Sequence, residues 1–196
     1  MTADLTDLER AHWAALCAGD TQLAIRLEAQ IDAADRADRA RLHAPDALAG
    51  AALWYAHQGI PVFPCQPGGK APATTHGLHD ATTDEAQVIT WWQATPQANI
   101  GLPTGHRFDV VDIDGPVGYL NADQVDIAGV RATAIGIALT PRGHHFYIPA
   151  VPGAANKVGI APGVDYRATG GYVVAPPSRV GDRDYYWVTP LQLAVR

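Results

Sequence analysis

The segment FDVVDIDGP, residues 108–116, places two carboxylates, Asp112 and Asp114, at the end of an apolar strand. Side chains alternate along a strand, so these two share one face, about 6.7 Å apart along the backbone, while Val111 and Ile113 point into the core. Like charges at the edge of a core need compensation. The pair is therefore either solvated at a loop mouth or bound to a hard cation such as Mg²⁺, which prefers oxygen ligands.

A histidine and an arginine follow in TPRGHHFYI, residues 140–148. The strand period places His145 and Tyr147 on one face. Arg142 and the glycine-bearing turn before His145 suit contacts with phosphate. A lone histidine in a strand is more often a packing or surface residue, so both interpretations stay open for His145.

A third polar segment is GVDYRATGGYVVAPPS, residues 163–178. Asp165 and Arg167 share a face of the predicted strand, and Gly170–Gly171 turn the chain back. Asp165 could complete a site for two ions, because two ions need more ligands than one pair of aspartates supplies.

The elements that must position these residues are short strands punctuated by glycine and proline, with helices between them. A helix is predicted over 47–58, and Thr82 with Glu85 indicates the start of another over 84–94. The region from 115 to about 130 has no clear pattern and is expected to be irregular. Strands are predicted at 60–65, 99–102, 108–114, 163–167, 171–175 and 184–188, with a hairpin from 134 to 149 and a long loop over 66–83. Helices among largely antiparallel strands favour an α+β fold.

Residues 2–41 read as two further helices, which gives an N-terminal helical appendage over 1–46 and a catalytic domain over 47–196. The appendage is equally consistent with a regulatory or partner-binding hairpin and with helices simply packed on the domain.

Composition limits the class of protein. The net charge is −6, of which residues 1–50 carry −4, so charge neither excludes a polynucleotide partner nor supports tight non-specific binding. Cys17 and Cys65 lie far apart and form no CxxC pair, so no zinc site or disulfide framework is expected. No apolar run of about 18 residues and no signal-like start is present, which predicts a soluble, cytoplasmic protein without membrane contact.

Taken together and in this order, VVDID, TPRGHHFY and GVDYRATGGYVVAPPS resemble the bifunctional primase–polymerase domain of the archaeo-eukaryotic primase superfamily. Upstream, ALWYAHQGIPVFPCQPGGKAP, HGLHDATTDEAQVITWW and NIGLPTG resemble the opening half of that domain, so the resemblance runs from about Ala47 to Val188. It implies a small α/β unit packed on an RRM-like antiparallel sheet unit. It also implies a replication protein of a plasmid, phage or integrated element in a bacterial host.

The resemblance further implies roles for individual residues. Asp112, Asp114 and Asp165 match the acidic positions of the family, which would hold two Mg²⁺ or Mn²⁺ ions. His145 matches the histidine that meets the phosphates of the incoming nucleotide, with Gly143 as the small residue before it. The turn before His145 is one residue shorter than the commoner Gly-Gly form. Arg142 and Arg167 are further candidate phosphate contacts, and Lys70 lies where the family often has a lysine near the nucleotide.

The expected partners are a single-stranded DNA template, a primer and NTP or dNTP substrates. The cysteine-rich zinc stem of some relatives is not possible here, and the helical and helicase regions usual in the family are not in this sequence. The chain is therefore expected to be either a fragment or a stand-alone version, with a helicase as a possible partner. The leading prediction is a template-directed nucleotidyltransferase, and the alternatives are a metal-dependent nuclease and a non-catalytic replication-initiation or DNA-binding module.

Overall fold

The structure is a computed structural model that describes residues 11–12, 14–16, 18–20, 22–28, 30 and 47–193. Contacts divide the chain into two units, residues 1–44 and residues 45–196. In the first unit the described residues from 11 to 16 and from 22 to 30 are helical. Asp20 caps the second of these helical segments, because its Oδ1 accepts a hydrogen bond from the Leu23 amide at 3.0 Å. The predicted boundary after residue 46 stays a prediction.

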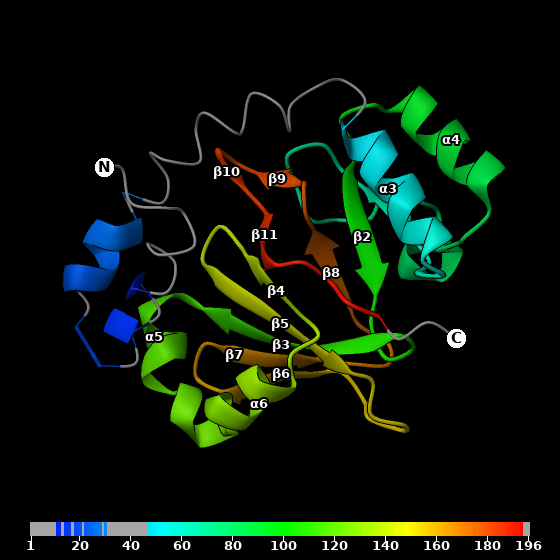
Figure 1. The fold of residues 1–196 in the computed structure, drawn as a ribbon. Coiled ribbons are helices and arrows are strands. Elements are labelled where there is room, and N and C mark those ends of the chain that lie inside the picture. Colours follow the sequence, from blue (N-terminus) through cyan, green and yellow to red (C-terminus); the bar gives the residue numbers. More distant parts are fainter. Residues whose placement is uncertain are drawn as a thin grey trace. The chain divides into compact units, whose positions relative to one another are not determined.

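The second unit is a mixed α+β domain built from antiparallel sheets, as the sequence predicted (Figure 1). Its helices and 3₁₀ turns are α3 (Ala47–His57), η1 (Gly77–Asp80), α4 (Glu85–Ala94), α5 (Gly115–Leu120), η2 (Ala122–Val125) and α6 (Ile127–Thr133). Its strands are β1 (Phe63–Cys65), β2 (Asn99–Pro103), β3 (Phe108–Asp114), β4 (Gly136–Leu139), β5 (Gly143–Pro149), β6 (Lys157–Ala161), β7 (Val164–Arg167), β8 (Tyr172–Ala175), β9 (Arg179–Val180), β10 (Arg183–Asp184) and β11 (Tyr186–Thr189).

The larger sheet has six strands in the order β11-β4-β5-β3-β7-β6. Strand β3 lies between β5 and β7, and all its residues except Asp114 are buried. The predicted hairpin is formed by β4 and β5 and is closed by a hydrogen bond from the Thr140 amide to the Gly143 carbonyl at 2.8 Å. The central strand of this sheet is therefore the one that carries the paired aspartates.

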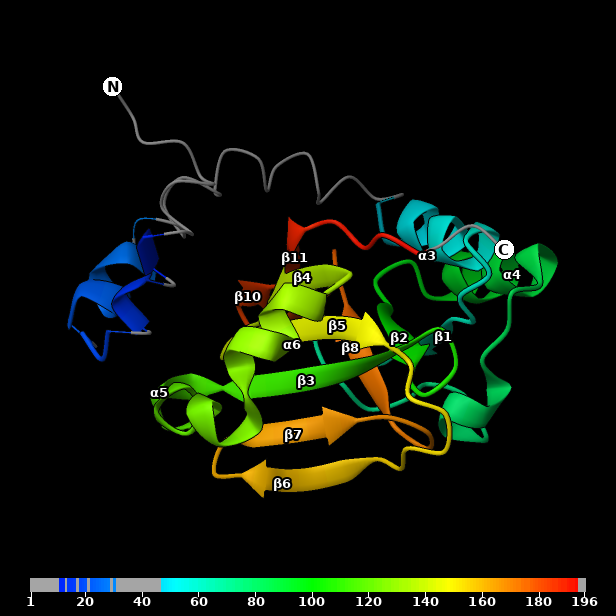
Figure 2. The ribbon, with the colours of Figure 1, turned by 60° about the horizontal axis from the view of Figure 1, so that its bottom comes forward.

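The two faces of the six-stranded sheet have different coverings. Helices α5 and α6 lie over one face (Figure 2), where Val111 and Ile113 are buried as predicted. On the opposite face Val110 and Tyr147 belong to a core cluster that also contains Leu102 of β2. Asp112 shares this second face with Val110, because both are even-numbered residues of the same strand.

The smaller sheet has three antiparallel strands in the order β1-β2-β8 and packs with α3 and α4. Trp92 anchors this layer: it is 2% exposed, and its Nε1 donates to the Ala98 carbonyl at 2.9 Å. The side chain of Tyr55 on α3 reaches the C-terminal end of β8, where its hydroxyl donates to the Pro176 carbonyl at 2.7 Å. These contacts fix the helices against the strands that border the site described below.

The structure corrects three local expectations. The region expected to be irregular forms α5, η2 and α6, where Pro116 lies at the start of α5 and the side chain of Asp126 caps α6 by accepting from the Gly129 amide. Asp84, rather than Thr82, caps α4. Strand β6 was not predicted: Lys157–Ala161 is short and has at its centre Gly159, a residue type that weakens strands.

In the part of the chain that the structure describes, none of the helices has the length and apolar character needed to cross a lipid bilayer.

Candidate active site

A row of polar residues crosses the centre of the six-stranded sheet. Asp112 on β3 is paired in register with His145 on β5 and with Asp165 on β7. Directly paired residues of antiparallel strands point to the same face with their Cβ atoms about 5 Å apart. Asp114 follows two residues along β3, on the same face and opposite Gly143. The fold therefore aligns three carboxylates and one imidazole, from three segments of the sequence, on one face of the sheet.

Asp112 lies at the centre of this row and is buried. Its Oδ1 lies 3.4 Å from His145 Nε2, and its Oδ2 lies 4.0 Å from Arg167 Nη2. Among the described residues Oδ1 has no hydrogen-bond partner. Burial raises the pKa of Asp112 to about 7, and the negative charge of Asp114 adds to this effect, while Arg167 and Lys70 oppose it. The nearby positive charges therefore do not fully compensate the negative charge of the Asp112 carboxylate.

Asp114 and Asp165 each have an arginine partner. Arg142 Nη2 donates to Asp114 Oδ2, and Arg167 Nη2 donates to Asp165 Oδ2. Asp165 Oδ1 also accepts from the Gly159 amide at 2.6 Å, so the exposed strand β6 helps to orient this carboxylate. The two arginines predicted as phosphate contacts therefore lie beside the acidic row as its counter-charges.

His145 is almost completely buried, and the side chains around it determine its charge. Burial lowers the pKa of His145 to about 3, and the positive charges of Lys70 and Arg167 act in the same direction. Its ring packs near those of Tyr147 and Tyr185, with centroids at 6.2 and 5.7 Å. At neutral pH His145 is an uncharged imidazole, which can donate and accept hydrogen bonds but does not add a positive charge to the site.

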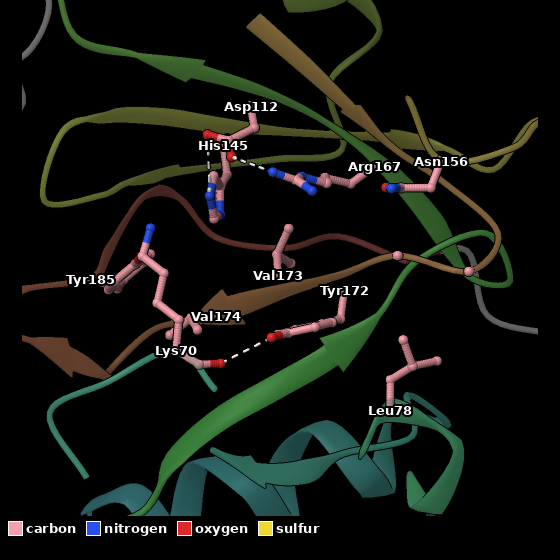
Figure 3. Close-up of a pocket in the computed structure, with 12 residues that line it drawn as sticks. Lys70, Leu78, Asp112, His145, Asn156, Arg167, Tyr172, Val173, Val174 and Tyr185 are labelled. Atoms are coloured by element: carbon pink, nitrogen blue, oxygen red, sulfur yellow. Dashed lines mark hydrogen bonds and ion pairs between the residues drawn. The ribbon is translucent and has the colours of Figure 1, made fainter. Parts of the chain in front are cut away.

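The acidic row opens into a cavity of about 270 Å³ (Figure 3). The cavity is lined by residues of the six-stranded sheet, of β8, and of the loop over 66–83. The residues that line it are Lys70, Leu78, Asp112, His145, Asn156, Arg167, Gly170, Gly171, Tyr172, Val173, Val174 and Tyr185. Four of the seven residues predicted for the site, Asp112, His145, Arg167 and Lys70, are in this lining. Asp114, Asp165 and Arg142 are not, although Asp165 and Arg142 are ion-paired within the same row.

Lys70 reaches the cavity from the long loop between β1 and η1. Figure 3 shows its side chain running from the loop toward the end of the cavity where Tyr185 and His145 lie. The backbone carbonyl of Lys70 accepts a hydrogen bond from the Tyr172 hydroxyl at 3.1 Å, which ties the loop to β8. The loop is thus held where its single lysine faces the acidic row.

Sequence reasoning missed the three remaining polar side chains of the cavity, those of Asn156, Tyr172 and Tyr185. Asn156 gave no signal, because a lone asparagine in a loop has no distinctive spacing. Tyr172 follows the glycine pair, which was interpreted only as a turn. Tyr185 falls within the strand predicted at 184–188 but lies between β10 and β11 in the structure, where it is 1% exposed and borders the cavity. A search for aromatic residues beside the glycine pair would have found Tyr172.

A divalent cation fits this donor set by its chemistry. Within the described residues, no three carboxylate, histidine or cysteine side chains are grouped closely enough to hold a metal ion. Two of the three carboxylates, those of Asp114 and Asp165, form ion pairs with arginines. The unpartnered, buried Oδ1 of Asp112 nevertheless needs a positive charge or a donor. The neighbouring donors are carboxylate oxygens, which suit Mg²⁺ or Mn²⁺.

Comparison with known proteins identifies one family. A family model described as "Bifunctional DNA primase/polymerase, N-terminal" matches residues 52–195, which is well over half of the chain. The match includes every residue named in the acidic row and in the lining of the cavity. No curated protein matches the sequence.

Proposed function

Because the chain belongs to the bifunctional DNA primase/polymerase family, which is a family of enzymes, we propose that it is a template-directed nucleotidyltransferase that makes or extends primers at the cavity beside Asp112. The observation that carries this proposal is the register of β5, β3 and β7, which aligns His145, Asp112 and Asp165 on one face. In the proposed archaeo-eukaryotic primase architecture, the layer of α3, α4 and β1-β2-β8 would be the smaller unit.

In the proposed reaction the 3′ oxygen of a primer forms a bond to the α-phosphorus of a nucleotide. The bond between that phosphorus and the bridging oxygen to the β-phosphate breaks, pyrophosphate leaves, and the hydroxyl proton passes to solvent. Asp112, Asp114 and Asp165 would hold two Mg²⁺ or Mn²⁺ ions. Such ions lower the pKa of the hydroxyl and neutralise charge on the leaving group.

The cationic and polar side chains around the cavity bind and orient the triphosphate. Lys70 and Arg167 line the cavity and supply positive charge. Arg142 is 66% exposed, so its guanidinium can move from Asp114 to a phosphate oxygen without opening the core. His145, being neutral, donates a hydrogen bond rather than a charge, and its fixed position in the sheet defines where that phosphate lies.

The wider context is proposed on the resemblance of the sequence alone. We place the protein in the replication of a plasmid, phage or integrated element of a bacterial host, with single-stranded DNA and a primer as partners and a helicase as a possible further one.

The test is an incubation of the full chain with a single-stranded template, with and without a primer, labelled nucleotides, and Mg²⁺ or Mn²⁺. Longer labelled products support the proposal. Shortened template would indicate a nuclease, and unchanged DNA would indicate a binding module. Asp112→Ala and Asp114→Ala should abolish synthesis, since each removes a carboxylate of the acidic row.

The matched control is Asp123→Ala, which removes an exposed carboxylate on η2, outside the cavity lining. It should retain normal synthesis. Near-normal synthesis by Asp112→Ala and Asp114→Ala proteins would contradict the proposed role of the acidic row.

A further inference from the structure

The cavity beside Asp112 has two chemically different ends. Figure 3 shows Lys70, Tyr185, His145 and Asp112 toward one end, and Asn156 and Leu78 toward the other. The first end carries the charges that suit a triphosphate. Arg167 lies between the two ends with its guanidinium directed toward Asp112, and the lining residues around Asn156, which include Leu78 and Gly171, are uncharged. A ligand with a charged end and a flat, uncharged end matches this division.

Tyr172 lies between the two ends, and two contacts fix its ring. Its hydroxyl donates to the Lys70 carbonyl at 3.1 Å. Its ring also packs edge-to-face on Phe63, with the centroids 5.2 Å apart and the planes at 76°. Phe63 is completely buried, so it is a rigid support. A ring held in this way loses little conformational freedom when a ligand packs on it.

The glycine pair and Asn156 shape the uncharged end. Gly170 has a φ of +87°, and a Cβ at this position would meet nothing within 4 Å, so the cavity is open there. A Cβ on Gly171 would overlap Asn156 Oδ1, so the amide of Asn156 lies directly over this glycine. Among the described residues Asn156 Oδ1 is buried without a hydrogen-bond partner. It is an acceptor in need of a donor, on a residue that lines the cavity.

We propose that Tyr172 and Asn156 form the nucleoside subsite of the cavity: the Tyr172 ring packs against the nucleoside, and Asn156 accepts a hydrogen bond from a sugar hydroxyl. The proposal rests on the proposed function, because it assigns the two ends of the same nucleotide. It makes Tyr172 and Asn156 determinants of substrate selection. It also connects the two ends, because the Tyr172 hydroxyl holds the carbonyl of the lysine that faces the phosphates.

The experiment measures equilibrium binding to the full chain with Mg²⁺ and without template, so that no synthesis occurs. The ligands are a ribonucleotide, a deoxynucleotide, a dideoxynucleotide and inorganic tripolyphosphate. Tyr172→Leu should weaken nucleotide binding about 5- to 100-fold, the range expected for the loss of aromatic stacking, and leave tripolyphosphate binding unchanged. Tyr172→Phe keeps the ring and should retain the preference for nucleotide over tripolyphosphate.

Asn156→Ala should weaken binding about 10-fold for ligands that carry the recognised hydroxyl, and it should have no effect on those that lack it. An effect confined to ribonucleotides identifies the 2′ hydroxyl. An effect on both ribonucleotides and deoxynucleotides, but not on dideoxynucleotides, identifies the 3′ hydroxyl. Equal weakening of all three nucleotides would overturn the role of Asn156.

Controls separate this inference from the proposed function. Trp54→Leu removes a half-exposed aromatic ring outside the cavity and should change neither affinity. Lys70→Ala should weaken nucleotide and tripolyphosphate binding alike. A wild-type protein that binds neither ligand would count against the proposed function. One that binds tripolyphosphate as tightly as nucleotide would overturn the nucleoside subsite alone.

If Tyr172→Leu does not fold, as judged by circular dichroism, the wild-type protein still provides a test. With isotope-labelled tyrosine rings, nuclear Overhauser effects should connect nucleoside protons to the Tyr172 ring. Effects that reach only the ring of Tyr185, at the charged end, would overturn the assignment of the two ends.

Discussion

Asp112 on β3 and Asp165 on β7 occupy directly paired positions of adjacent antiparallel strands, although the helices α5 and α6 and the strands β4, β5 and β6 separate them in the sequence. Each carboxylate is close to the guanidinium of Arg167, which bonds to Asp165 and lies 4.0 Å from Asp112. One arginine therefore compensates the charge of two carboxylates, and its interaction with Asp112 is the weaker of the two. Several measurable consequences follow from this imbalance and from the packing around it.

Replacing Asp112 by asparagine should stabilise the metal-free protein at high pH. The pKa of Asp112 is raised from 3.8 to about 7, so the folded state binds the proton more tightly than the unfolded state. The free energy of unfolding therefore falls as the pH rises from about 4 to about 7, by at most about 4 kcal/mol. In chelator, the advantage of Asp112→Asn over wild type in urea unfolding should be greatest at pH 8 and smallest near pH 4. A difference that does not vary with pH would contradict the burial of a charged Asp112.

His145 should stay neutral across the physiological range. Its pKa is lowered from 6.5 to about 3, so the folded state resists protonation, and stability falls as pH drops from about 6.5 toward 3. In NMR spectra of the folded protein the ring signals of His145 should not titrate between about pH 8 and 5. In the protein unfolded by urea the same signals should titrate near the usual value. A midpoint near 6.5 in the folded protein would show that the imidazole is accessible to solvent.

Arg142→Gln should strengthen the binding of Mn²⁺ to the protein without nucleotide. Arg142 is the ion-pair partner of Asp114, so its removal leaves that carboxylate available to a cation. The gain should be up to about 5-fold, since Arg142 is largely exposed and such pairs contribute little free energy. Electron paramagnetic resonance of free Mn²⁺ measures this affinity. Arg131→Gln, on α6, removes the same charge outside the cavity and should leave the affinity unchanged.

Gly143→Ala should disrupt the acidic row by displacing the backbone of β3. A Cβ on Gly143 would overlap the carbonyl oxygen of Ile113, which is the residue between the two aspartates of β3. We expect a loss of about 1–3 kcal/mol or more in the free energy of unfolding, together with a loss of synthesis. Gly50→Ala, in helix α3 where a Cβ would meet nothing within 4 Å, is the control and should stabilise the fold by about 0.5–1 kcal/mol. Equal effects of the two changes would show that β3 and β5 are not paired as described.

Several features of the protein follow from local sequence alone. Strand β3 and the hairpin of β4 and β5 have clear apolar patterns and turn residues, and their predicted bounds agree closely with the structure. The common face of Asp112 and Asp114 is also local, because it depends only on the two-residue period of a strand. The helices α5 and α6 escaped prediction because they have only 6 and 7 residues and both contain glycine.

Tertiary structure alone decided what lies beside each of these groups. The row of His145, Asp112 and Asp165 depends on which strands flank β3 and in what register, and that choice depends on packing between residues distant in sequence. The same holds for the raised pKa of Asp112, which comes from burial, and for the entry of Asn156 and Tyr172 into the cavity. A residue's type and direction are local properties, whereas its neighbours and its exposure to water are determined by the whole fold.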